Sequence, residues 1–446
     1  PLSARSEPAL AALARSYVEA LGRPERLENL VYTASVRRAH HEHRLAVVGP
    51  GAGGMREALT EYVAGGSHPA VIVGQNRKAP APVTFVFPGQ GSQWLGMGRR
   101  LLVDAPVFRE SFERCEEAIR REAGWSVMDR LTADRDLEGI DEVQPMLFAV
   151  SIALGALWQS WGIRPAAVVG HSLGEVAAAH VAGALDLADA IRVICRRSLL
   201  LRRLSGRGAM AAVDLTLEEA RAALEGLEDR LAIAVSNGPR STVISGDPAA
   251  LETVLTRLRE LNVFGRLVKV DVASHSPQVD EIALDLRREL DGIRPRTGAV
   301  PIYSTVTGGL IDGAALDAAY WTRNVRQPVL FGTAMEQVLE AGFTTVLEVS
   351  PHPILLTAIE GTARHVGRPA VLLSSLRRDH DEMTELLTSL GRLYCQGAPV
   401  HWPALQAPSV RPVALPQYPW QRRRFWLEDS TDPTEPARLR RGGRRP

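Results

Sequence analysis

One stretch of the sequence predicts the fold around it: Val168-Val169-Gly170-His171-Ser172-Leu173-Gly174-Glu175. A serine stands between two glycines, after an apolar strand over 166–169 and before helix-forming sequence, which matches the G-x-S-x-G nucleophile elbow. The glycines keep side chains small where the strand turns sharply into the helix, so the Ser172 hydroxyl is exposed. The N-terminus of that helix favours developing negative charge. Ser172 is therefore a candidate nucleophile, and the alternative is a serine in an ordinary strand-to-helix loop.

Strands and helices alternate on both sides of this stretch. This alternation predicts an α/β core in which helices cover both faces of a parallel sheet. Strands are expected at 83–87, 302–305, 344–349 and 370–373, and helices at 97–121, 146–158, 175–182, 187–204, 280–290, 327–340, 353–363 and 381–394. The helix over 146–158 is expected to open at Val143-Gln144-Pro145. The core is predicted to comprise 81–207 and 276–395.

Residues 208–275 have a different pattern, which reads as β-α-β-β-α-β. This is the ferredoxin-like alternation, and its length suits a small subdomain inserted into the core. Its last strand is expected over 267–272. The alternative is that these strands extend the main sheet.

The two flanks are predicted to be separate units. Residues 1–80 suggest a small α+β domain with helices at 7–21 and 55–64 and strands at 30–37, 43–48 and 70–74. A linker is expected at 78–82, where alanine and proline alternate. Residues 396–446 are rich in proline and lose their periodicity, which predicts an extended strap laid over another surface, followed by a disordered tail.

Composition limits the classes of function. The chain has 446 residues, 45% of them hydrophobic, and a net charge of +1, which gives no general reason to expect a nucleic-acid or membrane partner. The three cysteines, Cys115, Cys195 and Cys395, are far apart, so neither a disulfide framework nor a metal site is expected. A reducing cytoplasm fits them best. The start of the chain lacks the pattern of a signal peptide, and no apolar run is judged long enough to span a membrane. Because the sequence lacks an initial methionine, it is expected to be a piece of a longer polypeptide.

Two histidines are candidate bases for Ser172. His275 follows an apolar strand and has small residues on both sides, whereas His352 follows another apolar strand in Ser350-Pro351-His352-Pro353. A serine hydrolase or thioesterase of the α/β-hydrolase type would order its triad as serine, acid and a late histidine, which fits His352. A Ser/His acyltransferase would use His275 and need no acid.

Arg197 favours the acyltransferase. It lies in the predicted helix after the elbow, where hydrolysis needs no arginine, and a guanidinium facing Ser172 could bind a carboxylate through two hydrogen bonds. The alternative for Arg197 is an ordinary solvated helix residue. A docking scaffold without enzymatic activity is the remaining alternative, suggested by the flanking units.

Six ordered motifs together resemble the malonyl-CoA:ACP transacylase family, and more closely the acyltransferase domain of a modular type I polyketide synthase. They are Phe87-Pro88-Gly89-Gln90-Gly91-Ser92-Gln93, Val143-Gln144-Pro145, Gly170 to Glu175, Arg197, Val272-Ala273-Ser274-His275 and Glu348-Val349-Ser350-Pro351-His352-Pro353. Residues 1–80 resemble the linker between a ketosynthase and an acyltransferase, and Tyr418-Pro419-Trp420-Gln421 resembles the strap that runs back over the ketosynthase. The resemblance implies an α/β-hydrolase-like core with a ferredoxin-like insert.

The resemblance also implies roles for individual residues. Ser172 would be the nucleophile and His275 the base, which is oriented by a backbone carbonyl for which Asn324 is the nearest match. Gln90 and the backbone N–H of Leu173 would form the oxyanion hole, and Arg197 would bind the malonyl carboxylate. The acyl group would pass from CoA to the phosphopantetheine thiol of an acyl carrier protein, with no bound cofactor and no metal. The partners would be the carrier protein and, through both linkers, the ketosynthase.

The identity of the extender unit depends on four residues, Gln144, Leu173, Val272 and Ser274. In the resembled family, Tyr-Ala-Ser-His marks methylmalonyl transferases and His-Ala-Phe-His marks malonyl transferases. Ser274 leaves room for a substituent at C2, and Val143-Gln144-Pro145 also resembles the methylmalonyl type. Val272 and Leu173 depart from that type, and either could widen the pocket toward ethylmalonyl or longer chains. Methylmalonyl is therefore expected first, with a malonyl-specific or starter-unit transferase as alternatives.

Overall fold

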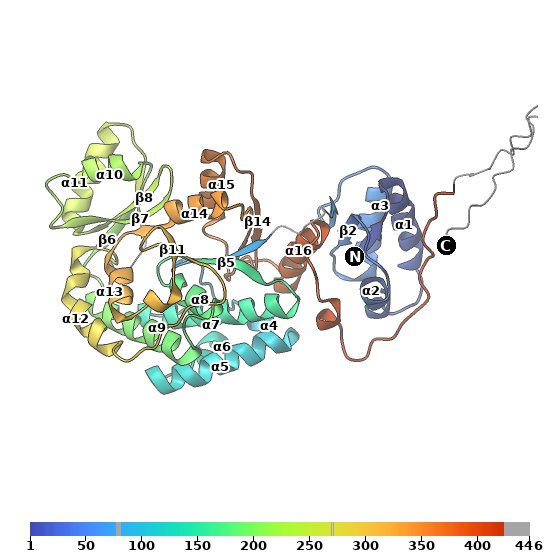
Figure 1. Cartoon of the computed structure of the whole chain (residues 1–446), viewed down its shortest axis with the longest axis horizontal. Coiled ribbons are helices and arrows are strands. Elements are labelled where there is room, and N and C mark those ends of the chain that lie inside the picture. The colour runs from blue at the N-terminus through green and yellow to red at the C-terminus, as the bar shows by residue number, and fades with distance from the viewer. Residues whose placement is uncertain (77–81, 269, 271, 423–446) are drawn as a thin grey trace, which may run out of the picture.

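The computed structural model describes residues 1–76, 82–268, 270 and 272–422 (Figure 1). The expected linker at 78–82 therefore lies almost wholly outside the described residues, as does the tail from residue 423 onward.

The N-terminal unit is a small α+β domain. Its antiparallel sheet has the order β1-β2-β3. The elements are β1 (Leu2–Ala4), α1 (Glu7–Ala20), α2 (Leu27–Val36), β2 (His43–Val47), α3 (Gly51–Val63) and β3 (Val71–Gln75). The strand expected at 30–37 is wrong, because that segment belongs to α2. Leu27, Leu30, Val31 and Ala34 recur at helical spacing, and burial of Leu30 and Ala34 in the core of this unit selects the helix.

The main sheet has the order β11-β10-β5-β4-β13-β14 and is parallel except for the edge strand β11. This confirms the predicted α/β core. The strands are β4 (Val83–Phe87), β5 (Pro165–Gly170), β10 (Ile302–Ser304), β11 (Gly309–Ile311), β13 (Thr345–Glu348) and β14 (Val371–Ser374). Phe85 and Phe87 enter one hydrophobic core and Val86 enters another, because successive side chains of a strand point to opposite faces. Both faces of the sheet are therefore buried.

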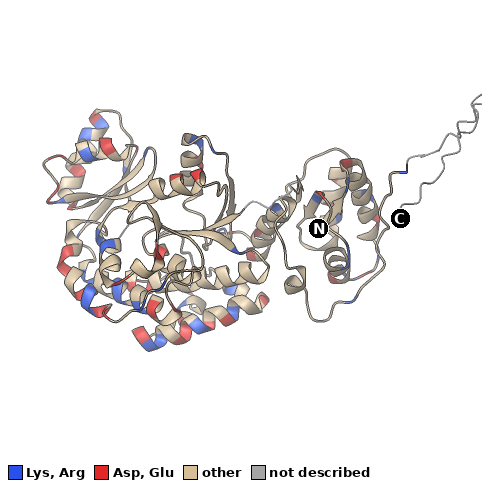
Figure 2. Ribbon diagram, in the orientation of Figure 1, with Lys and Arg blue, Asp and Glu red and all other residues tan. Residues whose placement is uncertain are grey.

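Helices flank this sheet (Figure 1). They are α4 (Arg99–Asp104), α5 (Pro106–Ala123), α6 (Val127–Thr132), α7 (Ile140–Ser160), α8 (Gly174–Val181), α9 (Leu187–Leu201), α12 (Asp280–Glu289), α13 (Ala318–Arg326), α14 (Phe331–Glu340), α15 (Leu356–His365) and α16 (Glu382–Cys395). Short 3-10 turns lie at Arg202–Leu204, Pro277–Val279, Gly313–Ala315 and Trp402–Leu405. Basic and acidic residues are interspersed along the outer helices (Figure 2). On α5 they form the ion pairs Arg120–Glu116 and Arg121–Glu117.

The helix α7 corrects two expectations. It begins at Ile140, so Pro145 lies inside the helix rather than in its opening segment. It is also long and apolar enough, by length and composition, to cross a membrane, contrary to the sequence-based judgement. However, 83% of its apolar window is buried inside the protein, between helices such as α5 and α9, which identifies it as a core helix.

The inserted subdomain has a sheet of its own, so the alternative of an extended main sheet is wrong. The sheet order is β12-β7-β8-β6-β9, and two helices cover one face of it. The elements are β6 (Ala209–Val213), α10 (Leu217–Ala223), β7 (Leu231–Gly238), β8 (Ser241–Gly246), α11 (Pro248–Glu260) and β9 (Gly265–Val268). The fifth strand, β12 (Val329–Leu330), comes from the core and was not predicted. The expected strand over 267–272 ends at Val268, and residues 269 and 271 lie outside the described part.

The segment after α16 runs back over the N-terminal unit. Leu415 is buried in the core of that unit, and Val413 and Tyr418 pack against it. The Tyr418 hydroxyl accepts a hydrogen bond from the Arg5 backbone N–H at 3.0 Å, and Ser6 Oγ donates to Gln421 Oε1 at 2.7 Å. The predicted strap is thus an extended segment laid over residues 1–76.

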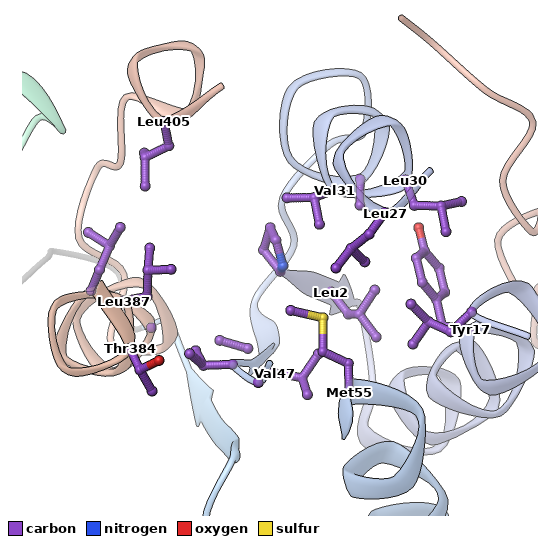
Figure 3. Close-up of a pocket in the computed structure, with 18 of the residues that line it drawn as sticks. Leu2, Tyr17, Leu27, Leu30, Val31, Val47, Met55, Thr384, Leu387 and Leu405 are labelled. Atoms are coloured by element: carbon purple, nitrogen blue, oxygen red, sulfur yellow. The ribbon is translucent and has the colours of Figure 1, made fainter. Parts of the chain in front are cut away.

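An apolar cavity of about 350 Å³ lies between the N-terminal unit and α16 (Figure 3). Leu2, Leu27 and Met55 line it from one side, and Leu387 and Leu405 line it from the other. Its lining includes none of the predicted site residues, and Ser172 lies instead after the end of β5.

Candidate active site

The elbow between β5 and α8 has the strained geometry that its glycines predict. Ser172 has a φ of 53°, in the left-handed region that non-glycine residues seldom adopt. A Cβ on Gly170 would lie 2.2 Å from the Glu175 backbone, and one on Gly174 would lie 2.0 Å from the Phe87 carbonyl oxygen. Only glycine fits at either position, so the sequence fixes the turn that presents Ser172.

His275 is the histidine that contacts Ser172. Its Nε2 lies 2.9 Å from Ser172 Oγ, and its Nδ1 lies 2.8 Å from the backbone carbonyl oxygen of Gln327. Because a carbonyl only accepts hydrogen bonds, Nδ1 must carry the proton, which leaves Nε2 free to accept the Ser172 proton. The arrangement thus has the geometry of a nucleophile paired with a general base.

The carbonyl that orients His275 belongs to Gln327, which corrects the expectation for Asn324. The helix α13 ends at Arg326, and the chain at Gln327 turns extended, so this carbonyl is free to face the imidazole. The backbone N–H of His275 also donates to the Val325 carbonyl at 3.0 Å. Asn324 lies one turn earlier on α13, and its side chain points instead to Arg197 and Glu175.

Burial keeps His275 neutral. Its side chain is 3% exposed, and desolvation, with a smaller contribution from the Arg197 charge, lowers its pKa from 6.5 to about 3. The neighbouring His171 is also neutral, since desolvation lowers its pKa to about 4. A neutral imidazole at ordinary pH is the form that a general base requires.

Arg197 is a buried cation beside the serine. It is 1% exposed, on the inner face of α9. Nη1 donates to Asn324 Oδ1 at 2.8 Å, and Nη2 approaches Ser172 Oγ at 3.4 Å. Nε has no partner among the described residues. Desolvation lowers the Arg197 pKa to about 10, so the group stays charged, and its Nε–Nη2 edge is available to a carboxylate.

Glu175 is a site residue that the sequence reasoning quoted without giving it a role. It is fully buried, and its carboxylate accepts hydrogen bonds from Thr305, Tyr320 and Asn324. Desolvation raises its pKa. The available signal was a charged residue in an apolar helix that packs directly under the elbow.

The two candidates for the oxyanion hole occupy different surroundings. Among the described residues no hydrogen bond uses the Leu173 backbone N–H, which lies at the start of α8. Gln90 is exposed and lines a cavity of about 940 Å³ together with Trp94, Val143 and Met146. Within the described residues Gln90 forms no hydrogen bond to Ser172 or His275.

The candidate specificity residues are mostly buried. Gln144 is 3% exposed, and its Oε1 has no partner among the described residues. Val272 is buried in the main core, and the side chain of Leu173 packs in the same core. The Ser274 carbonyl accepts a hydrogen bond from Ser245 Oγ at 2.9 Å, which ties the residue before His275 to strand β8.

The hydrolase alternative that used His352 loses its base. His352 Nδ1 accepts the Arg378 backbone N–H at 3.1 Å, and its own carbonyl accepts from Ser350 Oγ. Ser172 is paired with His275 instead. No cluster of metal-ligating side chains is found in the parts of the chain that the structure describes.

A strained serine, a histidine held by a carbonyl and a buried arginine meet after strand β5 of an α/β core, an arrangement that fits a Ser/His acyl-transfer site. The comparisons with known proteins agree with this class. The acyl transferase domain family matches residues 84–400, and a second family, the C-terminal region of CurL-like polyketide synthases, matches residues 1–59. The chain belongs to the acyl transferase family, as an acyltransferase domain of the modular polyketide synthase type.

Individual relatives support this assignment. The spectinabilin polyketide synthase protein NorA' of Streptomyces orinoci is 45% identical over 96% of this chain. The chain spans about 12% of the length of that relative. The acyltransferase domain from module 8 of the salinomycin synthase superposes with a TM-score of 0.85 and 38% identity, covering 92% of this chain and 97% of that one. The SpnD acyltransferase domain, solved in complex with 2-(pent-4-yn-1-yl)malonyl, has a TM-score of 0.79 and 26% identity, covering 91% and 96%.

Proposed function

We propose that this domain loads a C2-substituted malonyl extender unit from CoA onto the phosphopantetheine thiol of an acyl carrier protein. The observation that carries the proposal is Arg197, a buried cation whose Nη2 lies 3.4 Å from Ser172 Oγ and whose Nε has no partner among the described residues. A carboxylate at the far end of an acyl group bound to Ser172 can accept two hydrogen bonds from that edge.

The first half-reaction acylates Ser172. As the hydroxyl attacks the thioester carbonyl, His275 Nε2 takes its proton, and the Leu173 N–H and Gln90 stabilise the oxyanion. The tetrahedral intermediate collapses, the C–S bond breaks, and His275 returns the proton to the departing CoA thiolate.

The second half-reaction transfers the acyl group to the carrier. The phosphopantetheine thiol gives its proton to His275, and its sulfur attacks the acyl ester. The C–O bond to Ser172 then breaks, and the proton passes from His275 to Ser172 Oγ. Transfer exceeds hydrolysis when Arg197 fixes the acyl group so that the carrier thiol is better aligned than water.

Methylmalonyl is the proposed extender unit, with ethylmalonyl or a longer chain next. The small Ser274 supports this preference, because a bulky phenylalanine would occupy the space near C2. The related SpnD acyltransferase domain was solved in complex with 2-(pent-4-yn-1-yl)malonyl, which supports a C2-substituted malonyl group as the substrate class. Malonyl specificity and a starter-unit role are the competing outcomes.

The flanks are proposed to contact the ketosynthase, residues 1–80 as the linker before the acyltransferase and 396–446 as the linker after it. The match of residues 1–59 to a polyketide synthase region and the packing of Leu415 into the N-terminal unit support this arrangement.

The three cysteines are free and buried, which is consistent with the proposed reducing cytoplasm.

The test is intact-mass measurement of acylation with malonyl-, methylmalonyl- and ethylmalonyl-CoA, and with acetyl-CoA as the reference without a carboxylate. We expect methylmalonyl to be incorporated fastest, and Ser274→Phe to shift the preference toward malonyl by about tenfold or more. Absence of any dicarboxylic acyl group on Ser172 would contradict the proposed function.

A further inference from the structure

The buried carboxylate of Glu175 lies in direct contact with the residue that holds Arg197. Its Oε2 accepts hydrogen bonds from Tyr320 Oη at 2.6 Å and from Asn324 Nδ2 at 2.9 Å. Its Oε1 accepts from Thr305 Oγ1 at 2.9 Å and from the Thr305 backbone N–H. With its oxygens held this way, the carboxylate has a single orientation.

The four hydrogen bonds that Glu175 accepts and the nearby charge of Arg197 favour its ionised form against the desolvation that raises its pKa. An ionised carboxylate only accepts hydrogen bonds, so it fixes which way the Asn324 amide faces. The NH₂ group must point to Glu175, where it also donates to the Ser172 carbonyl at 3.2 Å. The Asn324 Oδ1 must then point the other way, where it accepts from Arg197 Nη1 at 2.8 Å. The order Glu175, Asn324, Arg197 is therefore a chain of matched acceptors and donors.

The interposed amide has a chemical consequence. A carboxylate in direct contact with Arg197 would occupy the donors that a substrate needs and would neutralise the cation. Asn324 instead holds only Nη1, so the charge of Arg197 is retained, Nη2 stays beside Ser172 Oγ, and Nε has no partner among the described residues.

We infer that Glu175 is a positioning residue that, through the Asn324 amide, aims the guanidinium of Arg197 at the acyl group on Ser172 and so sets the selectivity for dicarboxylic over monocarboxylic acyl groups. This inference rests on the proposed function. Glu175 and Asn324 touch neither the proton that His275 moves nor the oxyanion. Asn324 contacts Ser172 only at its backbone carbonyl, so we expect the Ser172 hydroxyl to stay reactive when the side chain of Glu175 or Asn324 is changed.

Glu175→Gln tests the orientation of the amide. The Thr305 backbone N–H requires an oxygen at Oε1, so the NH₂ of the new glutamine faces Asn324. Two NH₂ groups cannot pair, and a flipped Asn324 would turn its own NH₂ toward Arg197. We expect malonyl-CoA and methylmalonyl-CoA acylation to fall by about 10- to 100-fold, with acetyl-CoA acylation changed by less than about threefold.

Asn324→Ala tests the same link while Glu175 keeps its bonds to Thr305 and Tyr320. Its expected loss equals that of Glu175→Gln, and the double variant is expected to lose no more than either single variant. The matched control is Glu382→Gln, another buried glutamate, whose carboxylate accepts the backbone N–H groups of Gly98 and Leu101. It is expected to keep the ratio of methylmalonyl to acetyl acylation.

Labelling of Ser172 by a fluorophosphonate separates positioning from a merely structural role. Unchanged labelling in Glu175→Gln and Asn324→Ala with a lost preference for dicarboxylic esters supports the inference. An equal fall in labelling and in acylation by every ester, or an unchanged preference, overturns it. If the wild-type protein accepts no dicarboxylic ester, the proposed function fails and this inference fails with it, whereas failure in the variants alone leaves the proposed function intact.

Discussion

Two loops of this protein follow parallel strands of one sheet and carry the same residue types, a serine, a histidine and a glutamate. The elbow loop, residues 170–175, follows β5, and the second loop, residues 348–355, follows β13. Both strands pair in parallel with β4, so their carboxyl ends lie at one edge of the sheet. Residue types and position in the fold therefore do not distinguish them.

The partners distinguish them. Ser172 contacts His275, which is 103 positions away, and Arg197, which is 25 away. In the second loop, Ser350 Oγ donates to the His352 carbonyl, and Glu348 accepts the backbone N–H groups of Ile354 and Leu355. A reactive site therefore requires side chains from distant segments that contact one another. Side chains that satisfy nearby backbone groups form a structural loop.

Removing each of the two histidines in turn gives the largest expected effect. His275→Ala removes the proposed base of Ser172 and is expected to slow acylation by about a thousandfold or more, measured by intact mass. His352→Ala is expected to change the rate by less than about threefold. If His352→Ala inactivates the protein and His275→Ala does not, the comparison between the loops is reversed.

The buried arginine that contacts the elbow loop, Arg197 of α9, gives the next effect. Arg197→Ala removes the cation beside Ser172, so methylmalonyl-CoA acylation is expected to fall by about a hundredfold while acetyl-CoA acylation rises. Arg196→Ala is the matched control, because Arg196 lies on the same helix but is partly exposed and paired with Glu122. Equal losses in the two variants would remove Arg197 from the carboxylate role.

Glu348 is expected to affect stability and not selectivity. Burial raises its pKa from 4.5 to about 7, so the folded state binds more protons than the unfolded state between those values. Its contribution to stability therefore falls as the pH rises through that window. The free energy of unfolding of Glu348→Gln minus that of the wild type is therefore expected to rise by on the order of 2 kcal/mol between about pH 5 and about pH 7.5, measured by urea denaturation.

In that experiment the preference for methylmalonyl over acetyl-CoA is the control reading. It is expected to be unchanged in Glu348→Gln, since Glu348 bonds to its own loop. A changed preference would show that the second loop belongs to the reactive site.

The pH dependence of the rate at which Ser172 is labelled is expected to be the smallest effect. Because desolvation and the Arg197 charge lower the His275 pKa to about 3, the base stays neutral at higher pH. The rate of fluorophosphonate labelling is expected to vary less than about twofold between about pH 5.5 and 7.5. An inflection near the ordinary histidine pKa would contradict the burial of His275. In Arg197→Ala the His275 pKa is expected to rise, because the neighbouring positive charge is gone.

Much of the fold was predictable because its signals are local. The apolar runs of β4, β5 and β13 and the turn chemistry of Gly170 and Gly174 lie within a few residues of one another. The ferredoxin-like alternation is equally local. The errors arose where tertiary packing determines the structure. The sequence of α2 resembles a strand, but burial of one face in the core makes it a helix. The strand β12 has only two residues, which is too short a pattern to be recognised.

By itself the sequence determined the elbow at Ser172, the parallel core with its insert and the residues that resemble an acyltransferase. The resemblance had already given His275 as the expected base. The tertiary structure decided the contacts around it: Nε2 of His275 lies against Ser172, the Gln327 carbonyl rather than Asn324 orients His275, and Asn324 links Glu175 to Arg197. The physical reason is one of range. A turn depends on close approaches between near neighbours, whereas a hydrogen bond between distant segments depends on how the whole core packs around it.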